Sequence, residues 1–172
     1  MSESTPNTTP DAAGPTAAGS PPQMRVLAQY LKDHSFENPK APASFQNSEP
    51  PAMEVNVDVN ARALAEHQFE VELTVSAKAK RSEEVVFVID TTYAGAFEIM
   101  NVAKEQIEPV LLVECPRLLF PFIRQIIADT VNSGNFPPLM LEPIDFLAIY
   151  QQRMMQAQAQ AQQNGDQAPA HA

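Results

Sequence analysis

Cysteine is nearly absent from this sequence of 172 residues, because Cys115 is the only one. One thiol cannot form an intramolecular disulfide, a CxxC redox pair or a zinc site built on cysteines. This usage is typical of a protein of a reducing compartment, and we expect the cytoplasm. Glu114 lies beside Cys115 in an apolar stretch and is expected to raise the pKa of the thiol, which favours an inert, packed side chain.

Glycine and histidine are also scarce. The five glycines, at positions 14, 19, 95, 134 and 165, form neither a GxxxxGK(S/T) nor a GxGxxG pattern, so the familiar phosphate-binding loops are excluded. The run Asp33-His34-Ser35 has the residue types of a catalytic triad, but successive side chains of an extended chain point to opposite faces. His67 has no HxH or HExxH partner for a metal. We therefore expect no enzyme activity, no cofactor and no metal.

No long uninterrupted hydrophobic run occurs. The most apolar stretch, residues 110–127, contains two arginines, a glutamate and two prolines, which is too much charge and proline for a membrane span. The sequence begins with Ser, Thr, Pro and Ala and shows no positively charged region followed by an apolar run, so we expect no signal peptide. Both observations agree with the expected cytoplasmic location.

Positive charge is in deficit, with 11 Lys and Arg against 21 Asp and Glu and a formal net charge of −10. All of the cations lie between Arg25 and Arg153, and the acidic residues outnumber them within that segment too. Such a surface repels phosphate backbones and attracts basic segments of proteins. We therefore expect a protein partner with basic patches and no nucleic acid.

Composition predicts one domain between two tails. Residues 1–22 consist largely of Ser, Thr, Pro, Ala and Gly, bury too little apolar area to offset chain entropy, and are predicted to be disordered. Residues 23–153 have the apolar content of a single domain with a real core. Residues 154–172 are predicted to be a flexible, Gln- and Ala-rich tail, at whose start a helix can continue until Asn164 and Gly165 end it.

The strand patterns occupy the first part of the domain. Residues 25–31 could form a short strand, and strict alternation of apolar and polar side chains predicts half-buried antiparallel strands around residues 55–60 and 69–76. Residues 84–90 contain a continuous apolar run and predict a strand that is apolar on both faces. Such a strand needs cover on both faces, by the domain's own helices on one and by another subunit on the other.

Helical patterns follow the strands. We expect helical segments at residues 104–115 and 118–131, interrupted at Pro109 and Pro116, and a last helix with Asp145 as its N-cap. Strands first and helices last predict an α+β fold, with the helices on one face of an antiparallel sheet.

Two apolar segments lie outside these elements. Prolines at positions 39, 42, 50 and 51 predict an extended connection over residues 38–51, here called the crossing segment, which carries Phe45 and ends shortly before Met53. Residues 136–141 form an apolar loop. Both segments could pack as lids over the sheet, or they could wall a groove that accepts apolar side chains of unfolded chains, with Met and aromatic residues making adaptable contacts.

The run KDHSFENPKAP at residues 32–42, followed by Phe45, closely resembles the signature of the SecB family, a K-D-x-S-F-E core followed by spaced prolines and an aromatic residue. The runs PRLLFPF at 116–122, SGNFP at 133–137 and LEPIDF at 141–146 occur in the order and spacing of that family's helical half. Together they span about residues 24 to 153. The crossing segment lacks the tryptophan of many relatives.

The resemblance implies a homotetramer, arranged as a dimer of dimers, with a four-stranded antiparallel sheet in each subunit. It also implies an ATP-independent chaperone that binds unfolded secretory precursor proteins, keeps them competent for translocation and delivers them to the SecA motor. In the family, clients lie in grooves formed by the crossing segment and the loop before the last helix. The matching residues here are Phe45, Met53, Phe136, Pro137, Leu139 and Met140.

The resemblance further implies that a basic, zinc-bearing terminal segment of SecA contacts the outer surface of the sheet. The matching positions are Asp33, Glu37, Val88 and Asp90, of which the last two stand where the family commonly has Leu and Glu. From the residues alone, two other functions stay open. One is a binding module for a small apolar ligand with the same α+β architecture, and the other is a structural oligomer without a client.

Overall fold

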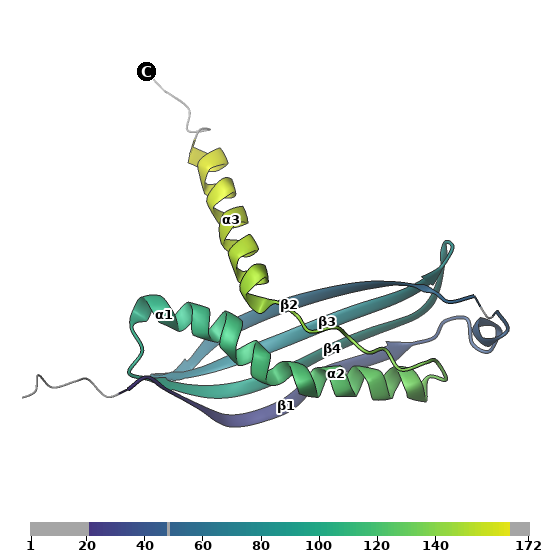
Figure 1. The fold of residues 1–172 in the computed structure, drawn as a ribbon, viewed down its shortest axis with the longest axis horizontal. Coiled ribbons are helices and arrows are strands. Elements are labelled where there is room, and N and C mark those ends of the chain that lie inside the picture. Colours follow the sequence, from purple (N-terminus) through teal and green to yellow (C-terminus); the bar gives the residue numbers. More distant parts are fainter. Residues whose placement is uncertain (1–20, 48, 166–172) are drawn as a thin grey trace, which may run out of the picture.

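The computed structural model describes residues 21–47 and 49–165, so residues 1–20 of the predicted N-terminal tail and residues 166–172 lie outside the description. Four long strands come first along the chain, and helices follow them (Figure 1). The strands are β1 (Gln23–Glu37), β2 (Ala52–Ala65), β3 (Gln68–Arg81) and β4 (Glu84–Met100). A short 3-10 helix, Ala43–Phe45, lies within the crossing segment.

The strands form one antiparallel sheet in the order β1-β4-β3-β2. Strands β2, β3 and β4 follow one another through tight turns, whereas β1 pairs with the last strand, β4. The crossing segment therefore has to carry the chain from one edge of the sheet to the other, which explains its length. The predicted α+β fold with a four-stranded antiparallel sheet is confirmed.

One continuous helical run follows the sheet. It consists of α1 (Lys104–Pro109), a π-helical segment (Val110–Glu114) and α2 (Cys115–Ser133), with no residue between them. The expected interruption at Pro109 and Pro116 is therefore wrong. A proline lacks the N–H for an ordinary helical hydrogen bond, and a local π segment accommodates that loss without ending the helix. Gly134 caps α2 at its C-terminus.

The last helix, α3 (Phe146–Gly165), extends away from the sheet (Figure 1). Its predicted N-cap is confirmed, because the backbone N–H of Ala148 donates to Oδ1 of Asp145 at 3.0 Å. The side chain of Phe146 is buried, but those of residues 151–162 are exposed. The start of α3 is therefore attached to the domain, where Ile149 and Tyr150 pack partly buried against the core and Arg153 hydrogen-bonds to Val59 and Asp58 of β2.

The core lies between the sheet and α2, which covers one face (Figure 1). The predicted alternation in β3 is confirmed, since its odd-numbered side chains from Val71 to Ala79 are buried and the even-numbered ones from Glu72 to Lys80 are not. Three α2 side chains, Leu119, Ile123 and Ile127, are fully buried against them. We call the face covered by α2 the inner face and the opposite one the outer face.

A β-bulge in β4 explains part of its continuous apolar run. Val85 is opposite Lys80 and Phe87 is opposite Ala79, which leaves Val86 without an opposite residue. Phe87 thus shares the inner face with Ala79, and Val85 shares the outer face with Lys80. Both Val86 and Phe87 are buried in one chain, so the run needs no second subunit to cover these two side chains.

Candidate functional site: an acidic outer face and an apolar inner edge

The structure brings the four predicted SecA-contact residues together on the outer face. Glu37 is directly opposite Val88, Ser35 is opposite Asp90, and Asp33 is opposite Thr92. Directly opposite residues of an antiparallel pair point to the same face. The intervening His34 bonds to Thr130 of α2 on the inner face, so Asp33 and Glu37 point outward.

A shallow depression lies beside these residues on the outer face. It has a volume of about 310 Å³ and spans β2, β3 and β4. Its lining includes Glu54, Asn56, Ser76, Lys78, Val88 and Asp90. Val88 and Asp90 thus face a recess that a side chain of a partner can enter.

Most other carboxylates of the outer face are already paired. Glu98 lies 3.0 Å from Arg25, Glu54 lies 2.7 Å from Lys80, and Glu72 lies 2.5 Å from Lys32. Within residues 21–47 and 49–165, by contrast, no cationic side chain lies within 4.0 Å of the carboxylates of Asp33, Glu37 and Asp90. We call these three residues the acidic patch. Its charge remains available to a basic partner.

The buried carboxylate Glu70 ties three strands together on the outer face. It accepts hydrogen bonds from Tyr30 and Lys32 on β1 and from Arg62 on β2, although β4 lies between β1 and β3. The β4 residues at this place, Ala94 and Ala96, are small enough for the β1 side chains to reach over them.

These contacts control the charge of Glu70. The hydrogen bonds from Arg62 and Tyr30, supported by Lys32, lower the pKa of the Glu70 carboxyl to about 2 against the opposing effect of burial. The side chain is 3% exposed, so a charged carboxylate here depends on its partners. We therefore assign this cluster to stability and not to partner binding.

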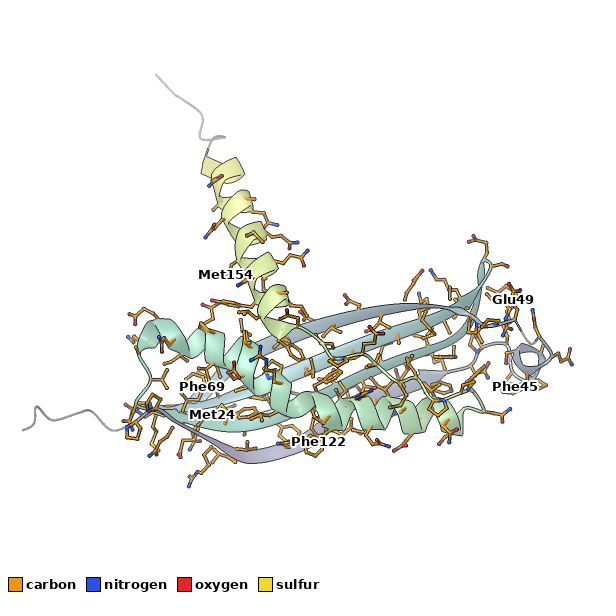
Figure 2. All side chains as sticks on the ribbon, viewed as in Figure 1. Met24, Phe45, Glu49, Phe69, Phe122 and Met154 are labelled. Carbon is orange, nitrogen blue, oxygen red and sulfur yellow. The ribbon has the colours of Figure 1, made fainter. Side chains whose placement is uncertain are left out.

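An aromatic row marks the inner face near the crossing segment. The ring centroids of Phe45 and Phe136 are 5.4 Å apart, those of Phe136 and Phe87 are 4.9 Å apart, and those of Phe87 and Phe36 are 5.7 Å apart. Such separations are typical of favourable aromatic pairs. Figure 2 shows Phe45 on the crossing segment, at the end of the sheet far from Met24. The Phe45 side chain is 42% exposed, so the row ends in an accessible ring.

An apolar groove lies along the inner face of the edge strand β2. It has a volume of about 360 Å³, and its lining is mostly apolar: Val55, Val57, Leu139, Met140, Leu141, Glu142, Pro143 and Ile144. Met53 lies on the same face of β2 as Val55 and Val57. Ala79 is opposite both Met53 and Phe87 in the register, which puts Met53 in line with the aromatic row.

The predicted client residues therefore fall into two neighbouring features. Phe45 and Phe136 belong to the aromatic row, Leu139 and Met140 line the groove, and Met53 lies on the strand that both features border. Pro137 is exposed in the same loop but lines neither feature. Val55 and Val57 also line the groove but were not predicted to do so, since their alternation indicated only strand structure.

His34 and Cys115 both make contacts within the fold. His34 lies 2.9 Å from Oγ1 of Thr91 through Nδ1 and 3.0 Å from Oγ1 of Thr130 through Nε2, and it links β1, β4 and α2. Cys115 is buried, with its Sγ 3.7 Å from Sδ of Met24. Burial, and then the nearby charge of Glu114, raise the pKa of the thiol to about 12.

The part of the chain that the structure describes holds neither a metal-binding cluster nor a membrane-spanning helix. Among its His, Cys, Asp and Glu side chains, no group of three or more is placed to hold a metal ion. None of its helices is long and apolar enough to cross a membrane.

Comparisons with known proteins point to one family. The family model described as "Preprotein translocase subunit SecB" matches residues 17–157. A "Protein-export protein SecB" of Rhodopseudomonas palustris (strain BisA53) is 50% identical over 150 residues, which cover 87% of this chain and 93% of the relative. Another, from Maricaulis maris (strain MCS10), is 49% identical over 167 residues and covers 95% of this chain and 97% of its own length.

A solved structure shares the fold. It is a Mycobacterium tuberculosis SecB-like chaperone in complex with a ChAD peptide from an antitoxin, with a TM-score of 0.58 and 17% sequence identity. The match covers 70% of this chain and 90% of the solved one. At this identity, the likeness shows that the four-stranded sheet and its helices form a fold already known.

Proposed function

The chain belongs to the SecB family, and from that membership we propose that it is an ATP-independent holdase of the cytoplasm. It binds unfolded secretory precursor proteins, keeps them competent for translocation and delivers them to SecA. The observation that carries this proposal is the separation of two surfaces on one sheet. Apolar features for a client lie at the inner face, and an unpaired acidic patch for a motor lies at the outer face.

Holding needs apolar burial and no catalysis. Burial of apolar surface is non-directional and contributes roughly 25 cal/mol per Å², so the groove and the aromatic row can bind many sequences. An extended segment of unfolded chain offers the apolar side chains that a folded protein hides. The structural relative is likewise a SecB-like chaperone in complex with a peptide.

Delivery rests on the acidic patch. Asp33, Glu37 and Asp90 attract the basic, zinc-bearing terminal segment of SecA, and the recess beside Val88 accepts an apolar side chain of it. Because the patch is exposed, salt screens the attraction. The client surface lies on the other face, so a client and SecA can be held together.

We further propose that four chains assemble as a dimer of dimers. The edge strand β1 and the helix α2 expose a set of large apolar side chains that one chain leaves uncovered: Val26, Leu27, Leu31, Leu118 and Phe122. Phe122 also stacks on Tyr93, with ring centroids 5.7 Å apart. An exposed apolar surface of this kind is typical of a subunit interface. Several client surfaces in one tetramer add avidity.

The proposed SecA contact is tested by charge reversal. The double substitution Asp33→Lys and Glu37→Lys should abolish binding of a basic SecA C-terminal peptide, measured by fluorescence anisotropy, and leave client binding unchanged. Glu66→Lys is the matched control, because its side chain is 92% exposed in the β2–β3 turn, away from the patch. Wild-type binding that does not weaken as salt rises would contradict an electrostatic contact.

The holding function is tested with an aggregation assay. In the absence of nucleotide, a tetramer excess should suppress aggregation of a denatured precursor, and native mass spectrometry should show a tetramer with bound client. Unchanged aggregation and no client complex would refute the holdase. Recovery of one small apolar molecule per chain, with no protection of unfolded protein, would instead favour the small-ligand module.

A further inference from the structure

Arg81, the last residue of β3, makes its hydrogen bonds to the backbone of the crossing segment. Its Nε donates to the carbonyl oxygen of Glu49 at 2.8 Å, and its Nη1 donates to that of Ser44 at 3.4 Å. Along the chain, one of these carbonyls precedes Phe45 and the other follows it. One guanidinium group thus holds the crossing segment at two residues, Ser44 and Glu49.

The crossing segment has little else to hold it. Among its described residues, Ser44 is the only buried one, at 7% exposure. A cavity of about 270 Å³ lies beneath it, lined in part by Ser44, Arg81 and Val86, so apolar packing does not fill this space. Two other contacts tie the segment to the rest of the fold: an exposed ion pair, 3.9 Å long, between Lys40 and Glu84 of β4, and the contact of Phe45 with Phe136. Among the described residues, the hydrogen bonds that reach the segment from the sheet are those of Arg81.

Ser44 connects the hydrogen bonds of Arg81 to the client surface. Its hydroxyl donates to Oδ1 of Asn38 at 3.0 Å, and its backbone N–H donates to the carbonyl oxygen of Lys40 at 2.9 Å. The next residue is Phe45, whose ring contacts Phe136. A contact that fixes the carbonyl group of Ser44 therefore also fixes the backbone from which the Phe45 side chain projects.

We propose that Arg81 is a positioning residue for client binding. It holds the crossing segment so that Phe45 already lies against Phe136 when a client arrives. The inference rests on the proposed holdase function. Without the hydrogen bonds of Arg81, Phe45 lies against Phe136 in only a fraction of the molecules. The apparent dissociation constant for the client then rises in inverse proportion to that fraction.

The experiment compares three single substitutions. Arg81→Gln removes both the charge and the guanidinium group that donates to two carbonyls. Arg81→Lys keeps the charge, but its ammonium group can reach only one carbonyl. Lys80→Gln is the control. Lys80 is the neighbouring residue, but it pairs with Glu54 at 2.7 Å on the outer face. The affinity is measured with a fluorescein-labelled, unstructured peptide rich in Phe and Leu. Arg81→Gln should weaken binding about tenfold, Arg81→Lys less, and Lys80→Gln not measurably.

A double-mutant cycle separates positioning from general loss of structure. In a Phe45→Ala background, Arg81→Gln should cause no further loss of peptide affinity, because the ring that it positions is gone. Hydrogen exchange of residues 38–47 should accelerate in Arg81→Gln, while binding of the basic SecA peptide stays unchanged.

The outcomes distinguish the two proposals. An equal loss of peptide affinity from Arg81→Gln in both backgrounds, or full affinity in Arg81→Gln, would overturn the role of Arg81 and leave the holdase standing. A wild-type protein that binds no peptide would overturn the holdase itself.

Discussion

Replacement of Glu70 by Gln tests the polar cluster that joins β1, β2 and β3. The substitution keeps the shape of the side chain but removes the charge that Arg62, Lys32 and Tyr30 stabilise, and it aims an amide N–H₂ group at one of these donors. A hydrogen bond to a charged group contributes about 1.5–3 kcal/mol net, so we expect a loss of roughly 2–4 kcal/mol in the free energy of unfolding at pH 7.

The pH dependence gives a sharper magnitude. The folded-state pKa of Glu70 lies near 2, below the unfolded value of 4.5, so its stabilisation is complete above about pH 5 and is lost as the pH falls through the folded pKa. The shift corresponds to at most about 3 kcal/mol, of which roughly 1 kcal/mol is lost by pH 3.5. The destabilisation caused by Glu70→Gln should therefore be about 1 kcal/mol smaller at pH 3.5 than at pH 7.

Urea unfolding at a fixed chain concentration measures both differences, since oligomer stability depends on concentration. Glu83→Gln is the control, because Glu83 lies exposed in the β3–β4 turn with no ion pair within the described ranges. The reasoning fails if Glu70→Gln costs the same at both pH values, or if it costs no more than Glu83→Gln.

Two further predictions concern Cys115 and Gly134. With a thiol pKa near 12, Cys115 should react with iodoacetamide at pH 8 roughly a thousandfold more slowly in the folded protein than in urea, and an equal rate would contradict its burial. In Gly134→Ala the new methyl group would overlap the ring of Phe36, so we expect a loss of about 1–3 kcal/mol and a lower melting temperature. Asn132→Ala, exposed on the same turn, should have little effect, and equal effects would refute the overlap.

The periodicity of apolar residues predicted which face of the sheet a side chain lies on, but it did not predict which strands are neighbours. Alternation buries the odd-numbered residues of β3. It also puts Asp33 and Glu37 on one face of β1, but only because this strand runs from Gln23 to Glu37 and is longer than the predicted residues 25–31. The pairing of Ser35 with Asp90 depends on β1 lying beside β4, and that order follows from packing of distant segments. The common location of Asp33, Glu37 and Asp90 was therefore inferred from family resemblance and not from the pattern of residues.

The misread features have physical causes of the same kind. Pro109 and Pro116 were expected to interrupt the helix, but a π segment between them accommodates the lost hydrogen bonds. The bulge at Val86 depends on the register with β3, which the apolar run does not reveal. The partners of Arg81 are backbone carbonyls, and no side-chain pattern marks a carbonyl for a guanidinium.

The pairing of the first strand with the last has a consequence for synthesis on the ribosome. Strands β2, β3 and β4 can form hairpins as they emerge, but β1 has left the ribosome first and must wait for β4. Contacts between such distant segments are slow to form. Until β1 docks, Glu37 lacks Val88 beside it and the crossing segment cannot span the sheet. A nascent copy of this chaperone thus completes both of its proposed binding surfaces only near the end of its own folding.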